Sequence, residues 1–354
     1  MVFKIRLSHP GSFALAALIQ LSSYSVPLMA QACFLADGKI MIPHPTTSAR
    51  NGAANIETVS AKPLSAVWGT LADGRVVATH RDKRVEDADA VEGHSDEAAG
   101  SLVSVAAGGS VETLLTSDVL RAFVSPGGDA IAAITPAREL VLWRSGKPPQ
   151  TISAPGKVSH VAWSPDGARL AAAVYPPEYS PHAMDNPRDV EQFIHLQNSD
   201  IYLFDANSGA LNSQLTTSPG TDYNPFFSPD GTQLYYVWLH ERENLGGLMR
   251  LTLDRDNGTS ASSPAVQVTQ AGADAGHVPL GRVGTYLFAK SGAALVFEAG
   301  RPDGSGEVWS MRADGKSAAF IAEGRKPQRL IDGTIAILTP ENNTRALTTA
   351  EVSR

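Results

Sequence analysis

Pairs of short apolar segments, each pair joined by a tight polar turn, recur along the chain. The clearest copies are residues 160–174 and 224–237, in which an apolar stretch leads into Ser-Pro-Asp-Gly and a second apolar stretch follows. Proline fixes φ early in such a turn, aspartate bonds nearby backbone N–H groups, and glycine accepts a positive φ. The pattern therefore predicts β-hairpins.

Four weaker copies of the same hairpin bring the total to six. They are residues 66–79, 120–134, 286–299 and 327–338. Further strands follow several hairpins, as at residues 200–209, which end in an Asp/Asn/Gly turn. Four antiparallel strands in each of six units are typical of a β-propeller. We expect an all-β fold: a six-bladed, alternatively seven-bladed, β-propeller of four-stranded antiparallel blades.

The two best copies also carry a family resemblance. Residues 200–237, DIYLFDANSGALNSQLTTSPGTDYNPFFSPDGTQLYYV, resemble a unit of the TolB-type propeller, with its I-Y-x-x-D, L-T and S-P-D-G elements. The resemblance covers roughly residues 55 to 340 and implies a TolB-like β-propeller without the N-terminal α/β domain of TolB itself. It implies the fold more strongly than any function.

The chain divides into three parts on this interpretation. Residues 1–32 are expected to be a signal peptide, and residues 63–354 form the propeller, with insertions at 81–100 and 175–199. Residues 33–62 form an N-terminal segment that we expect to close the last blade by adding its outer strand, because an open ring would leave strand edges exposed.

The start of the chain has the layout of an export signal. Lys4 and Arg6 precede an apolar run at residues 13–21, and Ala30-Gln31-Ala32 matches a cleavage site. A periplasmic or secreted location follows. Cleavage after Ala32 would make Cys33 the first mature residue, which is the position at which bacterial lipoproteins carry a lipid; an unmodified Cys33 is the alternative. Membrane contact is expected only through such a lipid.

Composition narrows the choice of chemistry. The sequence has one cysteine, so it has no intrachain disulfide and no cysteine-based metal site. With 29 basic against 36 acidic residues, a nucleic-acid partner is not expected. We expect a monomer without cofactor or metal.

Two long insertions and the strand starts beside them define the candidate site. Strand direction places both insertions on one rim of the ring, opposite the Pro-Asp-Gly turns. Loops that the fold does not require are frequent carriers of function. We expect an envelope protein or peptide to bind there, at Arg121, His160, Tyr179, His182, Phe193, His195, Tyr223, Asn224, His277 and Lys326.

A catalytic role is the alternative. No G-x-S-x-G elbow occurs, and the length leaves no room for the hydrolase domain of prolyl peptidases. The main expectation is therefore a non-catalytic binding module. A metal-assisted lyase or lactonase, acting on a sugar-derived substrate in the channel through His160, His277 and Asp222, is the competing hypothesis.

Overall fold

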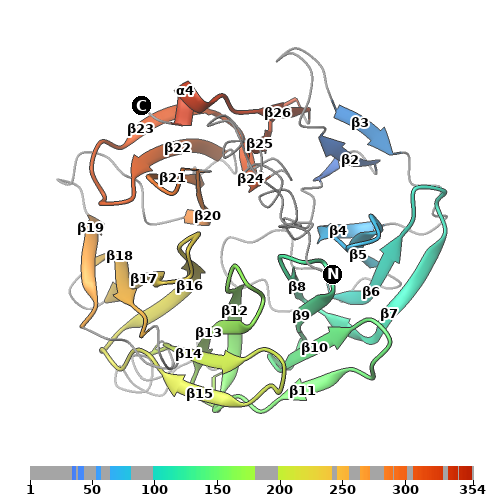
Figure 1. Cartoon of the computed structure of the whole chain (residues 1–354), viewed down its shortest axis with the longest axis horizontal. Helices are drawn as coiled ribbons and strands as arrows, with labels where there is room; N and C mark the ends of the chain where they lie inside the picture. The colour runs from blue at the N-terminus through green and yellow to red at the C-terminus, as the bar shows by residue number, and fades with distance from the viewer. Residues whose placement is uncertain are drawn as a thin grey trace, which may run out of the picture.

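Seven β-sheets surround a central axis in a ring (Figure 1). The computed structural model describes residues 34–36, 39–43, 53–56, 64–80, 99–179, 198–240, 245–254, 264–271, 283–289, 291–300, 306–329, 334–341 and 343–352. Within these ranges, five sheets have four strands and two have three, and each pairing within a sheet is antiparallel. Six of these sheets are the blades, and the seventh comes from the N-terminal segment, so the six-bladed β-propeller of antiparallel blades predicted from the repeats is confirmed.

Each repeated hairpin supplies the two inner strands of one blade. Blade 1 consists of β4 (Leu64–Thr70), β5 (Val76–His80), β6 (Gly100–Val105) and β7 (Val111–Val119). Blade 2 consists of β8 (Arg121–Val124), β9 (Ala130–Ile134), β10 (Leu140–Arg144) and β11 (Gln150–Ile152). Blade 3 consists of β12 (Lys157–Trp163), β13 (Arg169–Tyr175), β14 (Asp200–Asp205) and β15 (Leu211–Gln214).

The second half of the ring repeats this order. Blade 4 holds β16 (Thr221–Phe227), β17 (Gln233–His240), β18 (Leu245–Thr252) and β19 (Val266–Ala271); blade 5 holds β20 (Val283–Phe288), β21 (Ala294–Gly300), β22 (Gly306–Arg312) and β23 (Ala319–Glu323). Blade 6 has three described strands, β24 (Arg325–Arg329), β25 (Ile335–Leu338) and β26 (Thr344–Ala346), before the short helix α4 (Thr349–Val352).

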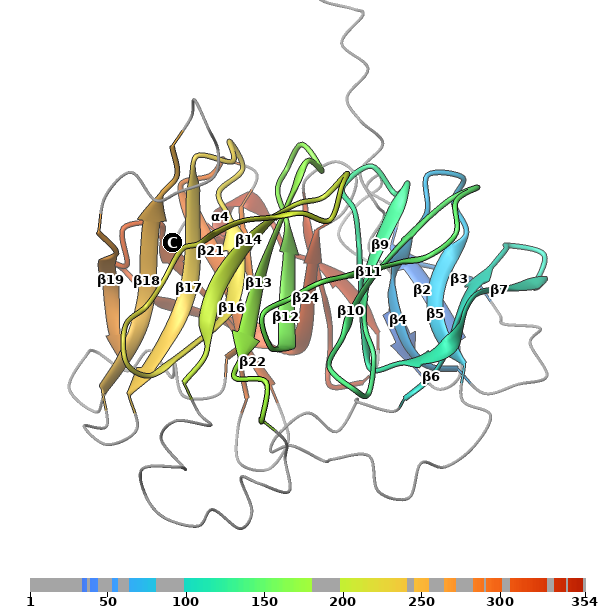
Figure 2. The same cartoon turned by 90° about the horizontal axis from the view of Figure 1, so that it is seen from below.

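Strand direction defines two rims of the ring. Seen from the side, the strands run across its thickness (Figure 2). The first strand of each blade ends, and the second begins, on one edge, which we call the turn rim. Strands β5, β13 and β17 end, and β6, β14 and β18 begin, on the opposite edge, which we call the insertion rim.

The Ser-Pro-Asp-Gly turns close through their own side chains. In blade 4, Ser228 Oγ donates to Asp230 Oδ1 at 2.6 Å and accepts from the N–H of Gln233 at 2.9 Å. Gly231 takes φ of 67° and donates its N–H to Ser228 O at 2.9 Å. Blade 2 has Ser-Pro-Gly-Gly-Asp instead, and Asp129 there accepts the Ser125 hydroxyl at 2.8 Å. The turn chemistry is therefore local and survives a two-residue displacement of the aspartate.

The hydrophobic core is divided among the boundaries between neighbouring blades. One cluster joins blades 2 and 3 around Leu140 and Leu170, and another joins blades 3 and 4 around Leu203 and Tyr236. Similar clusters lie between blades 1 and 2, 4 and 5, and 5 and 6. Polar links cross the same boundaries, as where Arg169 donates to the Gly231 carbonyl at 3.0 Å.

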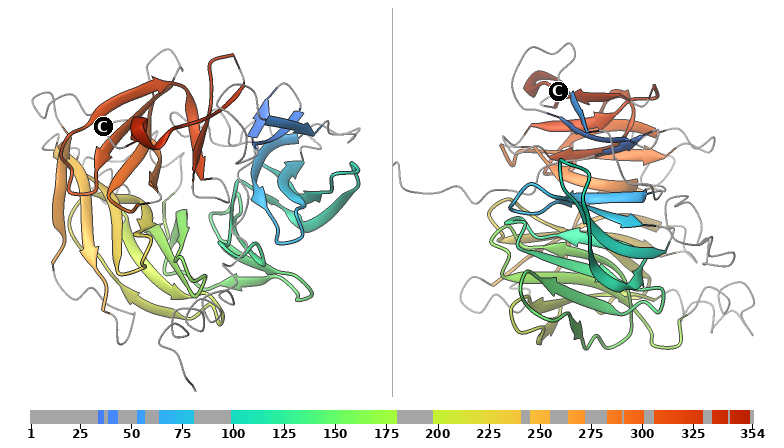
Figure 3. Two further views of the ribbon diagram at one scale, coloured as in Figure 1. Left: turned by 45° about the horizontal axis from the view of Figure 1, so that its top comes forward. Right: turned by 90° about the vertical axis from the view of Figure 1, so that its right-hand side faces the viewer.

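The N-terminal segment differs from the expected outer strand of the last blade. Its strands β1 (Phe34–Ala36), β2 (Lys39–Pro43) and β3 (Ala53–Ile56) pair with one another and not with β26. This sheet lies between β26 and blade 1 (Figure 3). Its Ile40 is fully buried against Val76, Ala78 and Val103. The segment thus covers the face of blade 1 by packing, because that face has an apolar surface to bury.

Several sequence predictions lie outside the described residues. They concern the signal peptide at 1–32, Cys33, and most of both insertions, at 81–98 and 180–197. In the part of the chain that the structure describes, no helix is long and apolar enough to cross a membrane.

Removing the Ile40 side chain tests the role of the N-terminal sheet. Ile40→Ala should lower the free energy of unfolding by about 2–5 kcal/mol, the usual cost of truncating a buried isoleucine. Val111→Ala, at a β7 position that is 42% exposed, is the control and should change it little. Chemical denaturation of both variants gives the comparison; equal effects would mean that the N-terminal sheet contributes nothing to closure.

Candidate functional site

Three predicted site residues from three successive blades form one line along the insertion rim. Arg121 begins β8, and its Nη1 lies 2.6 Å from His160 Nε2 on β12. The His160 ring in turn lies 6.1 Å from the Tyr223 ring on β16, centroid to centroid, at an interplanar angle of 53°. We call these three residues the rim line.

The rim line defines the tautomer of His160. A guanidinium can only donate, so Nε2 must accept the hydrogen bond from Arg121 and carry no proton. The proton then resides on Nδ1, which lies 3.2 Å from Ser159 Oγ. Ser159 Oγ donates onward to Ala173 O at 3.5 Å. In this arrangement both nitrogens of the imidazole are engaged in positioning contacts.

A pair of tyrosines stands beside the rim line, at the start of the second insertion. Tyr179 stacks on Tyr175 with centroids 4.3 Å apart and an interplanar angle of 23°. Burial raises the pKa of Tyr175, whose phenol lies within hydrogen-bond reach of Ser199. Burial likewise raises the pKa of Tyr223 to about 12, so both phenols stay neutral and can donate.

Two further predicted residues have strained backbone. Asn224 and Lys326 both have φ of 52° and both precede a proline, although the left-handed region is uncommon for residues other than glycine. Each lies at a β-bulge at the start of an innermost strand. The Lys326 N–H donates to Glu298 Oε2 at 2.6 Å. β24, which carries Lys326, lies across the ring from β12 (Figure 1).

The remaining predicted site residues cannot be placed with these. His182, Phe193, His195 and His277 lie outside the described residues. A binding role for the whole set stays a prediction.

A buried acidic pair lies beneath the rim, and the sequence predicted only one member of it, Asp222, as a residue of the competing lyase hypothesis. Asp222, at the start of β16, is fully buried, and neither carboxyl oxygen has a hydrogen-bond partner of normal geometry. Asp200 begins β14 on the neighbouring blade and accepts from Gln214 Nε2 at 3.0 Å. The Thr216 hydroxyl lies 3.4 Å from Asp200 Oδ1 and is also a neighbour of the Asp222 carboxyl. Because a hydroxyl has one proton, it can donate to only one of the two carboxylates at a time.

Burial dominates the electrostatics of this pair. It raises the pKa of Asp222 to about 8; a hydrogen bond from Thr216 opposes this rise, and the charge of Asp200 adds to it. The pKa of Asp200 is raised by burial to about 6, while hydrogen bonds from Thr216 and Gln214 oppose the rise. Desolvation disfavours the charged form of a carboxyl. Asp222 therefore retains a proton at neutral pH.

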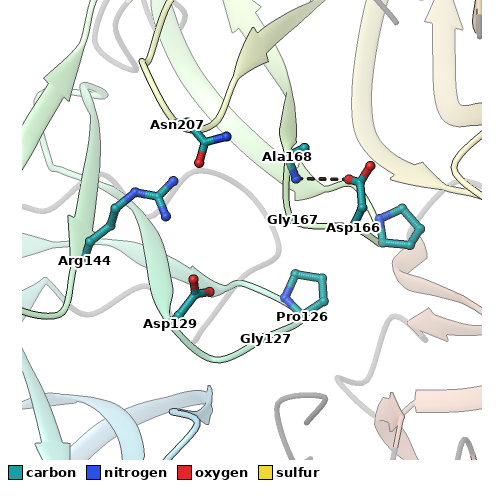
Figure 4. Close-up of a pocket in the computed structure, with 9 residues that line it drawn as sticks. Pro126, Gly127, Asp129, Arg144, Asp166, Gly167, Ala168 and Asn207 are labelled. Carbon is teal, nitrogen blue, oxygen red and sulfur yellow. Dashed lines mark hydrogen bonds between the residues drawn. The ribbon is translucent and has the colours of Figure 1, made fainter. Parts of the chain in front are cut away.

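A hollow of about 490 Å³ lies on the turn rim, opposite the predicted site, between blades 2 and 3. Figure 4 shows Arg144, Asp129 and Asn207 pointing into it from three strand ends. Arg144 Nη2 donates to Ala206 O at 2.6 Å, and Asp166 Oδ1 accepts the Ala168 N–H at 3.0 Å. Its polar groups are thus largely engaged in holding the two turns together.

Metal binding has no cluster to support it in the described ranges. Among these residues no group of three or more His, Cys, Asp or Glu side chains is placed to hold an ion. Asp222, which the lyase hypothesis placed on a channel metal, lies between two blades beside Asp200 and Tyr236.

Comparisons with known proteins support the fold and identify no activity. No family model matches the sequence, and no curated protein does. Among solved structures, a protein from Agrobacterium tumefaciens named as a TolB has a TM-score of 0.51 and 17% identity, over 82% of this chain and 92% of its own.

Two enzymes share the same architecture. The tricorn protease has a TM-score of 0.57 at 10% identity over 91% of this chain, which spans 32% of that protein. An oligogalacturonate lyase from Vibrio parahaemolyticus has a TM-score of 0.51 at 10% identity, over 78% of this chain and 75% of its own. At these identities the matches establish the propeller fold alone.

The buried acid predicts an unusual pH dependence of stability. The unfolded chain loses the Asp222 proton near pH 4, whereas the folded chain keeps it to about pH 8, so stability should fall as pH rises between these values. The slope approaches about 1.4 kcal/mol per pH unit. Denaturation of wild type and Asp222→Asn at pH 5, 6, 7 and 8 measures it, and the variant should lose the slope above about pH 6, where Asp200 no longer contributes one.

A second aspartate provides the control for this experiment. Asp205 has a pKa lowered by hydrogen bonds from Ser208, so its titration lies below the window measured. Asp205→Asn should shift stability by a constant amount and leave the slope intact. An equal slope in wild type and Asp222→Asn would contradict the assignment of a buried neutral acid.

Proposed function

We propose that this chain is an exported, non-catalytic binding protein of the bacterial envelope that engages a protein or peptide at the insertion rim. The observation that carries the proposal is the rim line, in which Arg121, His160 and Tyr223 from three successive blades meet in one continuous row. The stacked Tyr175 and Tyr179 extend this row toward the second insertion.

The chemistry of the row suits a polypeptide partner. Tyrosine and arginine are the side chains that contribute most often to binding hot spots, because they combine a large apolar area with hydrogen-bonding groups. Here each is already oriented, Arg121 by His160 and Tyr179 by Tyr175, so little side-chain entropy is lost on binding. A protein surface or an extended peptide would contact all five side chains.

The proposal assigns no reaction to the propeller. His160 is held by Arg121 and Ser159, and its line of contacts leads to Tyr223 and not to a nucleophile. The likeness to a lyase is a likeness of fold. No cofactor, metal or nucleic acid is part of the proposed activity, and the propeller is expected to act as a monomer.

Variants on the two rims test the binding site. Arg121→Ala with Tyr179→Ala should reduce the recovery of specifically bound envelope proteins at least about tenfold, whereas Asn207→Ala on the turn rim should not. Immobilised wild type and variants, matched in melting temperature, are compared on the same envelope extract. Equal recovery by all forms would place the binding face elsewhere.

A metal measurement on the same preparations addresses catalysis. Stoichiometric Ca²⁺, Mn²⁺ or Zn²⁺ that is lost in His160→Ala would contradict the non-catalytic proposal and support the lyase or lactonase hypothesis. Elemental analysis of wild type and this variant gives the answer.

Export is tested on protein from the native host. The Lys4 and Arg6 charges, the apolar run and Ala30-Gln31-Ala32 support cleavage after Ala32 and a periplasmic or secreted location. Intact-mass analysis should find a mature chain that begins at Cys33, either unmodified or with the added mass of a lipid anchor. A chain that retains residues 1–32 would contradict export.

A further inference from the structure

Asp222 occupies a position at which three other blades have an aliphatic residue. In four blades the register places this first-strand position opposite the end of the second strand: Leu64 opposite His80, Val158 opposite Val174, Asp222 opposite Trp238, and Val283 opposite Ala299. Val158 is fully buried, as Asp222 is. An acid therefore stands at a position where blades 1, 3 and 5 have an aliphatic residue.

Burial and the neighbouring acid make the ionised form of Asp222 costly, and only the Thr216 hydroxyl opposes them. Asp200 on β14 and Tyr236 on β17 are the titratable groups coupled to its charge, and the rim groups Tyr175 on β13, His160 on β12 and Tyr223 on β16 lie along the same blade boundary. No cation among the described residues is coupled to it. A buried carboxylate that has no counter-charge, and that shares its one hydroxyl donor with a second carboxylate, is strongly unfavourable.

The backbone of Asp222 holds blade 3 to blade 4 at the insertion rim. Its N–H donates to Ser199 O at 2.9 Å, and its carbonyl accepts from Ser199 Oγ at 2.7 Å. The Ser199 N–H donates to Gly220 O at 3.2 Å, and Asn198 Oδ1 accepts the Gly220 N–H at 3.0 Å. Ser199 is also the neighbour of the Tyr175 phenol. The acid thus lies directly under the contact that positions the tyrosine pair.

We propose that Asp222 is a proton-operated latch: its neutral form keeps Asn198 and Ser199 docked on Gly220 and Asp222, and its ionisation releases this contact between blades 3 and 4. The released carboxylate gains water, which the docked arrangement denies it. The latch would regulate the rim that the proposed function uses, and in that respect it rests on the proposed function. Docking itself is measured without any ligand, so either proposal can fail while the other stands.

The pH dependence of the latch follows from linkage. The undocked acid titrates near pH 4 and the docked acid near pH 8, so the equilibrium constant for undocking should rise about tenfold per pH unit between about pH 5 and 8 and level off above that. A neutral side chain at this position removes the dependence.

Amide hydrogen exchange of the full chain measures how often the contact between blades 3 and 4 opens. The informative amides are those of Ser199, Ile201 and Asp222, which are hydrogen bonded across or beside the contact. Exchange is followed by mass spectrometry from pH 5 to 9 in wild type, Asp222→Asn and Asp222→Val, and each wild-type rate is divided by the variant rate at the same pH. The Gly231 amide, in the turn on the other rim, is the internal reference.

The ratio of the wild-type exchange rate to the variant rate tests the proposal. A ratio that rises with pH at the amides of Ser199 and Asp222, while the ratio at Gly231 stays constant, supports the latch. A constant ratio against both variants overturns it, and agreement between the Asn and Val variants excludes a folding defect of either one. A pH dependence that disappears when CaCl₂ is added would also overturn it, because Asp200 and Asp222 would then be a cation site.

Discussion

Face-to-face packing of neighbouring sheets is the interaction on which the ring depends. A β-sheet has two faces, and in this protein neighbouring sheets cover them, so the apolar clusters lie between blades and between blade 1 and the N-terminal sheet. Single sheets of this size would expose too much apolar surface to be stable alone. Each blade is therefore held in place by its neighbours, and a change at one boundary acts on the strand starts that both blades contribute to the rim.

The repeated hairpins could be predicted because their chemistry is local. Ser228, Asp230 and Gly231 satisfy one another within a single turn, and the same contacts recur in the other clear copies. The N-terminal sheet could not be predicted in the same way. Its Ile40 is buried by strands β5 and β6, which follow it by some tens of residues, and its strand pairing depends on which face of the ring is left uncovered.

The rim line was predictable from repeat position, since equivalent residues of successive blades must lie side by side. Arg121 and His160 occupy equivalent repeat positions, and Tyr223 is adjacent to the equivalent Asn224. Repeat position did not predict the Asp200–Asp222 pair, because the sequence of one strand does not show which side chains of the neighbouring blade its face packs against. Alignment of the copies within the chain carries the signal: Asp222 replaces Val158 of the preceding blade.

Asp222 stands where blade 3 has Val158, and this difference costs folding free energy that no gain in packing offsets. The cluster around Leu203 and Tyr236 would accept an aliphatic side chain at the start of β16, as the equivalent cluster of blade 3 does with Val158. Burying even a neutral carboxyl with incomplete hydrogen bonding costs free energy. The acid is placed under the contact that orients Tyr175 and not in the middle of the blade. A boundary weakened at that one point, within a ring otherwise tied by apolar faces, can open locally without unfolding the propeller.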